Sequence, residues 1–483
     1  MKNNLKSQVL SSLIWKFLER GGTQGIQFII QLFLARLLSP EDYGTIALIT
    51  IFISIAGVFI DSGFNTALIQ QKEIDDEDIS SVFYTSLVVS IIMYIILFFT
   101  SPLIASFYKI KELVLIIRVL SLTLIIGVFN SIQGAIVSRR LEFKKFFFSN
   151  LGAITISGTM GVILAYKGFG VWTLVYQQII SQIVTFIILY FTVRWKPRLL
   201  FSIKKVKKLF SYGSKLLLSA LIDTIYRNII GLIVGRVYSS TELAYYNRGN
   251  SFPSLIVGNI NGSIQAVIFP ALSSLQHDKE KVKDLMRRAV VTSSYIVFPA
   301  MIGLIVIAEP MIRLILTEKW LPCVPYLRLF CLVYALWPIH TANLQAINAI
   351  GRSDIFLKLE IIKKVLGVCI IIVTSRHSPL MMALGMVGSG VIGSFINSYP
   401  NKKLLNYSYF EQMKDILPSV ILSIIMGIIT YSIIFLGLSD LLTIVLQIIV
   451  GGAIYILLSY AVKLECFIYL LETIKNNRRG RYV

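Results

Sequence analysis

The chain has 483 residues, of which 56% are hydrophobic and only 15% are charged, and its mean hydropathy is +0.76. Soluble globular proteins carry about 25% charged residues, so this composition excludes an ordinary soluble protein. The formal charge is +21, from 46 Lys and Arg against 25 Asp and Glu. Because the bases lie in short clusters between apolar runs, they indicate the loops of a membrane protein, with no nucleic-acid partner.

The cysteines and histidines do not form a pattern that would hold a metal or a disulfide framework. No CxxC pair occurs, and three of the four cysteines lie within or beside apolar runs, where we expect them to pack. The four cysteines are Cys323, Cys331, Cys369 and Cys466. We also expect no cleaved signal peptide, because the first apolar run is full length and lacks a small-residue cleavage site.

Fourteen stretches have the length and composition of a membrane-spanning helix, which needs about 20 largely apolar residues. In chain order they lie near 12–37, 43–64, 82–107, 114–136, 147–166, 170–192, 210–237, 251–272, 289–312, 325–349, 355–374, 379–398, 416–437 and 441–462. The connections are short and leave no room for a soluble domain. The sequence therefore predicts an all-α polytopic membrane protein with about fourteen transmembrane helices.

The distribution of Lys and Arg predicts the orientation of these helices. Cytoplasmic loops of membrane proteins hold an excess of these two residues. If the N-terminus is cytoplasmic, the basic clusters at 139–145, 194–208 and 279–288 all fall on the cytoplasmic side. The opposite side then holds only scattered bases, such as Lys109 and Lys319. We therefore expect both termini in the cytoplasm.

The two halves of the chain resemble each other at a nearly constant offset. A shift of 200 residues aligns ARLLS at 35–39 with GRVYS at 235–239, and a later shift of 212 places Gln133 on Gln345. Parallel repeats of this kind occur in transporters and are related by an axis along the membrane normal. We therefore expect an N-terminal lobe, a C-terminal lobe and two additional C-terminal helices with a basic tail, over 1–200, 201–400 and 401–483.

Polar side chains recur at helical spacing in the first two predicted helices of each half. One face of the first helix carries Lys16, Arg20, Gln24, Gln27 and Gln31. In the seventh helix the polar residues recur every four positions, at Lys215, Ser219, Asp223 and Arg227. The second helix contributes Asp61 among other polar residues. Two such halves facing each other would enclose a polar cavity with a net positive charge.

Basic residues inside predicted membrane helices have two interpretations. A charge at the bilayer centre costs about 2.5–3.5 kcal/mol, so it usually faces protein or a wet cavity. Arg36 and Arg236 lie near helix ends, where their side chains can reach the interface, whereas Arg20 and Arg227 lie deeper. The alternative is that these groups only join helices, with Asp223 and Arg227 as an i,i+4 ion pair. Taken together, the stripes favour a transport pathway for an anionic cargo, because Arg matches phosphate oxygens with a planar set of donors.

Three segments add a family resemblance to this pattern: ARLLSPEDYG at 35–44, GFGVWTLVYQQ at 168–178 and AEPMIRLILTEKW at 308–320. With the polar stripes, they resemble the polysaccharide flippases of the multidrug/oligosaccharidyl-lipid/polysaccharide exporter superfamily, in particular its lipopolysaccharide and colanic-acid exporter branch. The resemblance covers essentially the whole chain. It implies a MATE-like fold of two six-helix lobes in a bacterial cytoplasmic membrane. It also implies a V-shaped central cavity that opens alternately to each side.

The resemblance implies a cargo of undecaprenyl pyrophosphate that carries an oligosaccharide repeat unit for O-antigen, capsule or exopolysaccharide. Basic cavity residues would engage the pyrophosphate. That role falls on Arg20 and Arg227 first, and the cavity lining would include Lys16, Lys215, Gln24 and Gln27. The candidates for coupling to an ion gradient are Glu19, Asp61 and Asp223, each of which is alternatively a structural partner of a nearby base. No catalytic residue, cofactor or metal is implied. We expect a monomer surrounded by membrane lipids, with a polysaccharide polymerase and other assembly proteins as further partners.

Two other functions remain open from the sequence. A drug/cation antiporter of the same fold should prefer acidic cavity residues, whereas basic ones predominate here. A membrane-embedded polymerase or glycosyltransferase usually needs a large outer loop, or an acidic metal-binding motif on a soluble domain. The only acidic candidate is the run DDED at 75–78, which we expect to be a solvated loop. Topology and contact with anionic lipids explain the basic run KKVKK at 204–208.

Overall fold

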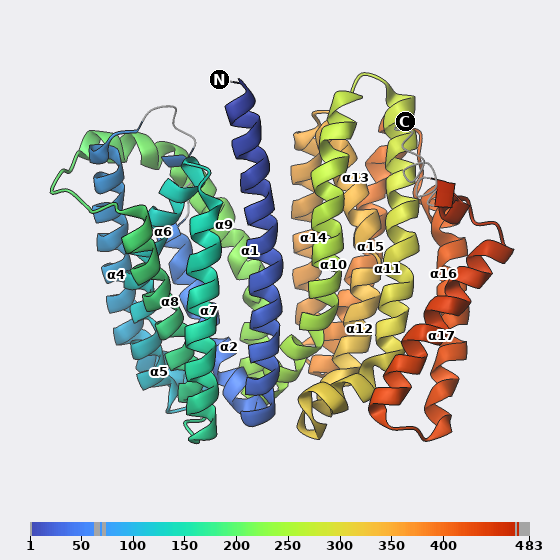
Figure 1. The fold of residues 1–483 in the computed structure, drawn as a ribbon, viewed down its shortest axis with the longest axis horizontal. Coiled ribbons are helices and arrows are strands. Elements are labelled where there is room, and N and C mark those ends of the chain that lie inside the picture. Colours follow the sequence, from blue (N-terminus) through green and yellow to red (C-terminus); the bar gives the residue numbers. More distant parts are fainter. Residues whose placement is uncertain (1, 62–67, 70–73, 469–470, 473–483) are drawn as a thin grey trace. The chain divides into compact units, whose positions relative to one another are not determined.

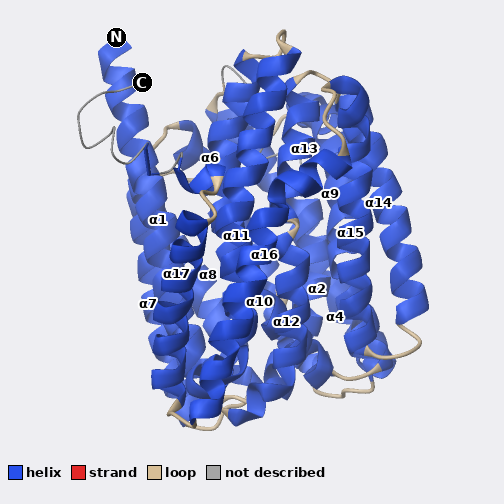
Figure 2. Ribbon diagram, turned by 90° about the vertical axis from the view of Figure 1, so that its right-hand side faces the viewer, coloured by secondary structure: helices blue, strands red, loops and turns tan. Residues whose placement is uncertain are grey.

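The computed structural model describes residues 2–61, 68–69, 74–468 and 471–472, and this part of the chain contains helices and no strand (Figures 1 and 2). It divides into two compact units, Met1–Ala244 and Tyr245–Val483, here called unit 1 and unit 2. The helices of unit 1 are α1 (Lys2–Leu37), α2 (Pro40–Asp61), α4 (Asp76–Tyr108), α5 (Leu113–Leu120), α6 (Leu122–Arg139), α7 (Phe143–Tyr166), α8 (Val171–Val193) and α9 (Ile203–Val237).

Helix α10 (Ser240–Ser274) begins in unit 1 and continues into unit 2. The other helices of unit 2 are α11 (Lys279–Leu316), η1 (Glu318–Cys323), α12 (Val324–Ala335), α13 (Trp337–Ala349), α14 (Ser353–Thr374), α15 (Pro379–Leu404), α16 (Tyr409–Tyr431), η2 (Ser432–Leu436) and α17 (Asp440–Ala461).

The all-α membrane fold is confirmed. Within the described residues, twelve helical segments are long and apolar enough to cross a membrane. The predicted stretches 12–37 and 355–374 are helical as well, within α1 and α14, but they are not among these twelve. The last of these stretches carries Lys358, Glu360, Lys363 and Lys364, which lower its hydropathy. The count of fourteen transmembrane helices therefore stays a prediction.

Two of the predicted helices are broken in the middle, and they are the fourth helix of each half. The predicted stretch 114–136 becomes α5 and α6, with the break at Ser121, whose hydroxyl donates to the backbone oxygen of Ile117 at 2.6 Å. The stretch 325–349 is interrupted at Leu336, just before Pro338. Proline has no N–H to donate to the preceding turn, and its ring crowds that turn, so the helix breaks there.

The repeat is visible in the local structure at the start of α2 and α10. Ser39 and Asp42 cap α2 reciprocally: the Asp42 amide donates to Ser39 Oγ at 3.2 Å, and the Ser39 amide donates to Asp42 Oδ2 at 2.9 Å. Two hundred residues later, the Glu242 amide donates to Ser239 Oγ at 3.0 Å. A serine oxygen thus accepts from the amide three residues on at the start of both helices, and the reciprocal contact of Asp42 is an addition at α2.

In unit 1, α7 packs against α1 and α8, and α9 packs against α2 and α4. Glycines allow the helices to approach closely. A Cβ atom at Gly44 would collide with the backbone of Ser240, and one at Gly158 would collide with the side chain of Ile30. Because α9 contacts α2 and α4, it falls within unit 1, although the repeat assigns it to the second half. The division into lobes at residue 200 therefore stays a prediction that follows the repeat.

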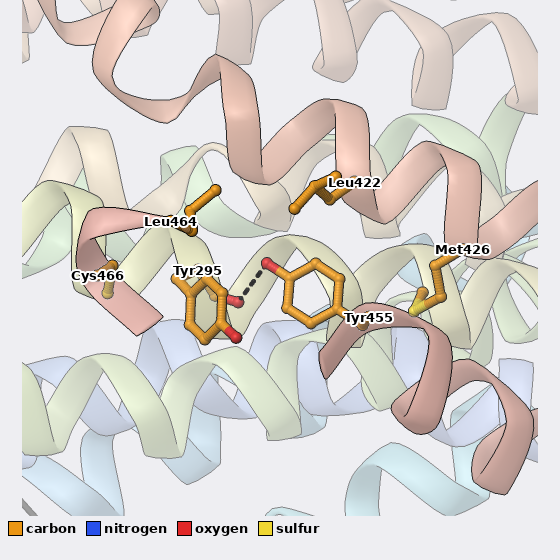
Figure 3. Packing of buried hydrophobic residues seen from close by; sticks show 6 residues of the cluster. All are labelled: Tyr295, Leu422, Met426, Tyr455, Leu464 and Cys466. Atoms are coloured by element: carbon orange, nitrogen blue, oxygen red, sulfur yellow. Dashed lines mark hydrogen bonds between the residues drawn. The ribbon is translucent and has the colours of Figure 1, made fainter. Parts of the chain in front are cut away.

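In unit 2, α11 contacts α12, α13, α16 and α17. The two C-terminal helices are held to α11 by a buried cluster of apolar and aromatic side chains (Figure 3). Its members are Tyr295, Leu422, Met426, Tyr455, Leu464 and Cys466. The Tyr455 hydroxyl donates to the backbone oxygen of Tyr295 at 3.0 Å, and the Tyr295 hydroxyl donates to Ser459 Oγ at 3.2 Å. Each buried hydroxyl thus has a partner, as burial in an apolar environment requires.

Candidate functional site

Helix α1 contacts α7 through one face. The ring of Trp15 lies 5.5 Å from that of Phe147 and 5.9 Å from that of Phe148, measured between centroids. One turn further on, Asn150 Nδ2 donates to Glu19 Oε1 at 2.8 Å. Glu19, a predicted coupling residue, is thus a partner of α7 in unit 1.

The predicted polar stripe of α1 lies on a different face. At 100° per residue, Lys16, Arg20, Gln24 and Gln27 are turned from Trp15 and Glu19 by roughly a third of a turn. Gln27 is exposed and Gln24 is half-buried. The side chains of Lys16 and Arg20 lie outside the described residues, although both positions are helical. The face of α1 that carries the stripe is therefore not the face that packs against α7.

Helix α9 carries the second predicted group. Arg227 Nε lies 2.7 Å from Asp223 Oδ2, and the two side chains are 76% and 38% exposed. The i,i+4 ion pair considered from the sequence is therefore present. The Arg227 side chain is thus largely exposed within the apolar segment Leu216–Val237. Lys215 in α9 and Asp61 at the end of α2 occupy helical positions, but their side chains lie outside the described part of the chain.

Two other bases inside the predicted helices have structural contacts in equivalent places. Arg118 Nε donates to the backbone oxygen of Phe98 at 3.3 Å and to Ser101 Oγ at 3.1 Å. Pro102 cannot donate to the Phe98 carbonyl, which accepts instead from the Ser101 hydroxyl at 2.8 Å and from the Arg118 guanidinium. In unit 2, Arg328 Nε donates to the backbone oxygen of Ile305 at 3.4 Å. These two arginines stabilise the ends of long helices.

A buried amide network in unit 2 was not predicted from the sequence. Asn343 Nδ2 on α13 donates to Gln412 Oε1 on α16 at 2.7 Å, and Asn401 Nδ2 on α15 donates to Asn343 Oδ1 at 2.7 Å. All three residues are fully buried. The sequence shows Asn and Gln within apolar stretches, which indicates polar contacts between helices. It does not show which of these residues pair, because that depends on which helices become neighbours. The network joins three helices, as hydrogen-bonded amides do in membranes.

Residues 33–325 match the model of the polysaccharide biosynthesis protein family, which covers more than half of the chain. The chain belongs to this family. It is similar to three curated proteins. It is 24% identical to the succinoglycan biosynthesis transport protein ExoT of Rhizobium meliloti, over 73% of this chain and 71% of that protein. It is 26% identical to the teichuronic acid biosynthesis protein TuaB of Bacillus subtilis, over 78% and 79% of the two chains. It is 23% identical to the lipopolysaccharide biosynthesis protein WzxC of Escherichia coli, over 88% and 89%.

Solved structures show the same fold in other transporters. The lipid II flippase MurJ in an inward closed conformation aligns with a TM-score of 0.72 at 19% identity, over 94% of this chain and 98% of that one. An inward-facing MATE family multidrug transporter of the MOP superfamily aligns with a TM-score of 0.62 at 17% identity, over 79% and 94%. The predicted MATE-like fold is confirmed. This member of the polysaccharide biosynthesis protein family is a multi-pass membrane protein.

The acidic run at 75–78 is not the solvated loop that the sequence suggests. It forms structural contacts. Asp75 and Asp78 form a capping box at the start of α4. Lys205 Nζ lies 2.6 Å from Asp75 Oδ2, 2.9 Å from Glu77 Oε2 and 3.6 Å from Asp78 Oδ1. The hydrogen bond from Lys205 lowers the pKa of Asp75 to about 2. The run thus fastens the beginning of α9 to the beginning of α4.

No side-chain set for a metal appears among the residues that the structure describes. No group of three or more His, Cys, Asp and Glu has a metal-binding arrangement there. Cys323, Cys331 and Cys466 are buried free thiols, and Cys369 is an exposed one.

Proposed function

We propose that this protein is a flippase that moves a lipid-linked oligosaccharide repeat unit across the bacterial cytoplasmic membrane. The observation that carries the proposal is Arg227, a 76% exposed guanidinium in the middle of an apolar helix. An exposed charge at such a position is costly unless it faces water or a ligand, and it marks a transport pathway. Its family membership and the biosynthetic names of its relatives support a role in supplying polysaccharide precursors.

The cargo would be undecaprenyl pyrophosphate carrying an oligosaccharide. Arg227 on α9 and Arg20 on α1 would bind the pyrophosphate, since guanidinium groups form bidentate, charge-assisted hydrogen bonds with phosphate oxygens. Lys16 and Lys215 would add positive charge, and Gln24 and Gln27 would donate hydrogen bonds to sugar hydroxyls or phosphate. The lipid tail would stay in the bilayer while the head group crosses by alternating access, without chemistry on the cargo.

The ion pair on α9 suggests how binding could be gated. In the structure the Asp223 carboxylate is paired with Arg227. A pyrophosphate carries more negative charge than a carboxylate, so it would displace Asp223 from the guanidinium. Asp223 would then be available to bind a proton or a cation, which makes it the first candidate for coupling to an ion gradient. Glu19 and Asp61 are the further candidates.

The topology follows from the positive charges. Both termini and the basic clusters would face the cytoplasm, because translocated loops are poor in Lys and Arg. The protein would not be an enzyme. It would act as a monomer among membrane lipids and hand its cargo to a polysaccharide polymerase and other assembly proteins on the outer side.

Complementation tests this function directly. The protein is expressed in a bacterium that lacks its own polysaccharide flippase, and lipid-linked repeat units are measured on each face of the membrane. We expect repeat units on the outer face only when the protein is present. Units that stay inside in strains supplied with O-antigen, capsular and teichuronic-type precursors, despite good expression, would contradict the proposal.

A drug/cation antiporter is the second candidate, and the fold shared with a multidrug transporter favours it. Vesicles containing the purified protein would then accumulate a cationic dye when a proton or sodium gradient is applied. Dye transport without any movement of lipid-linked sugar would replace the flippase proposal with this one.

A further inference from the structure

The connection between α8 and α9 exposes four large apolar side chains within five residues. The exposed fractions are 95% for Leu199, 42% for Leu200, 56% for Phe201 and 73% for Ile203. Exposed apolar surface costs about 25 cal/mol per Å² in water, so a concentrated group of this kind usually contacts a membrane or another protein.

The backbone of this connection is fixed at both ends. The Arg198 amide donates to Ser80 Oγ at 3.2 Å, and the Ser202 amide donates to Ser81 Oγ at 2.9 Å. Both serines are fully buried in the first turns of α4. Because the two ends are held against α4, the side chains between them project away from unit 1. Their exposure is therefore a consequence of the fold.

The length of α4 places this connection at the level of the lipid head groups. The helix has 33 residues. At 1.5 Å per residue it is about 50 Å long, whereas the hydrocarbon core is about 30 Å thick and the whole bilayer about 40–45 Å. The first turns of α4 carry Asp76, Glu77 and Asp78, which exclude them from the hydrocarbon. The serines that hold the connection are therefore expected outside the hydrocarbon core, at or beyond the level of the head groups.

The charges around the connection favour an anionic surface. The nearby acidic run 75–78 is engaged by Lys205, and Asp76 is paired with Arg198 at 2.8 Å. Lys196, Lys204 and Lys207 remain exposed on either side of the apolar residues. Each Lys near an anionic leaflet is attracted to it electrostatically. In Figure 1 the connection extends at the side of unit 1, next to the end of α4 where these charges lie.

We propose that residues 199–203 insert into the head-group and acyl boundary of the leaflet that faces the basic clusters, while Lys196, Lys204 and Lys207 bind anionic phospholipid head groups. Apolar side chains beside bases bind interfaces in this way, through buried area and electrostatic attraction together. Residues 199–203, here called the anchor, would fix the beginning of α9 at the membrane surface. Lys205 contacts the acidic run, so the beginning of α4 would be held at the same level. The inference is independent of the cargo.

An environment-sensitive fluorophore at position 199 tests the anchor. The label is attached to Leu199→Cys in a Cys369→Ser background, because the other three cysteines are buried. The control is Lys281→Cys in the same background, at the beginning of α11, where the Lys281 side chain is 68% exposed. Both full-length proteins are reconstituted in vesicles of phosphatidylcholine with or without phosphatidylglycerol. Quenching is measured with lipids that carry a nitroxide near the head group and with aqueous iodide.

We expect the label at position 199 to shift to shorter wavelength and lose most of its emission to the nitroxide lipid, more so with phosphatidylglycerol, while the control is quenched by iodide. Equal quenching of both labels by iodide would overturn the proposal. Protection of the label at 199 from both quenchers would also overturn it, because a second protein surface would then cover the connection. A label at Phe201→Cys repeats the test if the first variant does not fold.

Discussion

At the scale of single residues, Arg227 and Arg118 show that a basic side chain inside an apolar helix can either remain exposed or form hydrogen bonds with a neighbouring helix. Arg118 donates hydrogen bonds to a backbone carbonyl and a serine hydroxyl, and its guanidinium lies 4.2 Å from the centre of the Phe98 ring. Arg227 has a carboxylate partner on its own helix and remains largely exposed. Hydropathy cannot distinguish these cases, because both residues interrupt an apolar run in the same way. The contacts distinguish them, and they make Arg227 the position to test.

Replacing Arg227 should abolish transport without unfolding the protein. We expect Arg227→Ala to reduce surface polysaccharide at least about tenfold, since a hydrogen bond to a charged group contributes about 1.5–3 kcal/mol. Arg227→Lys should retain part of the activity, because it keeps the charge and loses the bidentate geometry. Surface polysaccharide is measured in the complemented strain, with protein abundance in the membrane as the reference. Arg376→Ala, at an exposed position between α14 and α15, is the control, and equal effects of the two alanine variants would contradict the assignment.

The contact between Asp75 and Lys205 predicts a dependence of stability on pH. The pKa of Asp75 is lowered from 3.8 to about 2 in the folded protein. A lowered pKa means that the carboxylate stabilises the fold above pH 3.8, and that this contribution disappears as the pH falls toward 2. We expect Asp75→Asn to lower the unfolding temperature at neutral pH and to match the wild type at pH 2. The effect should stay below about 1 kcal/mol, because the pair is exposed.

Thermal unfolding of the detergent-solubilised protein across this pH range measures the effect. Lys205→Gln should reproduce it at neutral pH, and Lys204→Gln, which removes an exposed neighbouring charge, should not. A pH-independent difference between wild type and Asp75→Asn would assign the effect to the helix cap instead of the ion pair.

At the scale of helices, the two C-terminal helices α16 and α17 are bound to the rest of unit 2 by polar groups as well as by the cluster of Figure 3. Arg287 on α11 makes two hydrogen bonds to the carboxylate of Asp415 on α16, at 2.9 and 3.0 Å. The Tyr407 hydroxyl donates to the same carboxylate at 2.6 Å. Lipid tails are as apolar as the helix surfaces, so no hydrophobic effect drives two apolar helices together in the bilayer. Polar contacts such as these therefore specify which helices pack against each other.

The amide network should therefore stabilise unit 2 as a group. We expect Gln412→Leu to destabilise the protein by roughly 1–3 kcal/mol, because it removes one acceptor of the buried Asn343 amide, which keeps only its contacts with Ile339 and Asn401. The double variant Asn343→Leu with Gln412→Leu should recover part of that loss, since it removes both members of the pair. Unfolding temperatures of the purified variants measure this coupling, with the exposed Gln276→Leu as control. Additive effects of the two single changes would show that they act independently.

At the scale of the whole molecule, the sequence predicts the all-α membrane fold because length and hydropathy determine its helices, while twelve spans in the described residues leave the count of fourteen a prediction. It also predicts an internal repeat, which stays a prediction, and the serine caps at Ser39 and Ser239 stand at positions that this repeat aligns. The sequence does not predict the break at Ser121, or the pairing of Lys205 with the run 75–78. These depend on which helices become neighbours, and residues 130 positions apart carry no local signal of their contact. For the same reason Glu19 could be proposed as a coupling residue, but its bond to Asn150 could not.

The orientation of the whole chain can be tested independently of transport. The basic clusters at 194–208 and 279–288 predict a cytoplasmic location for both, and the connection near Arg376 should lie outside. We expect alkaline phosphatase to be active when fused after residue 376 and inactive when fused after residue 403 or at the C-terminus. Green fluorescent protein should give the opposite pattern, because it does not fluoresce after export in an unfolded state. Phosphatase activity at the C-terminus would invert the topology, and it would then place residues 199–203 in the outer leaflet and reverse the assigned direction of transport.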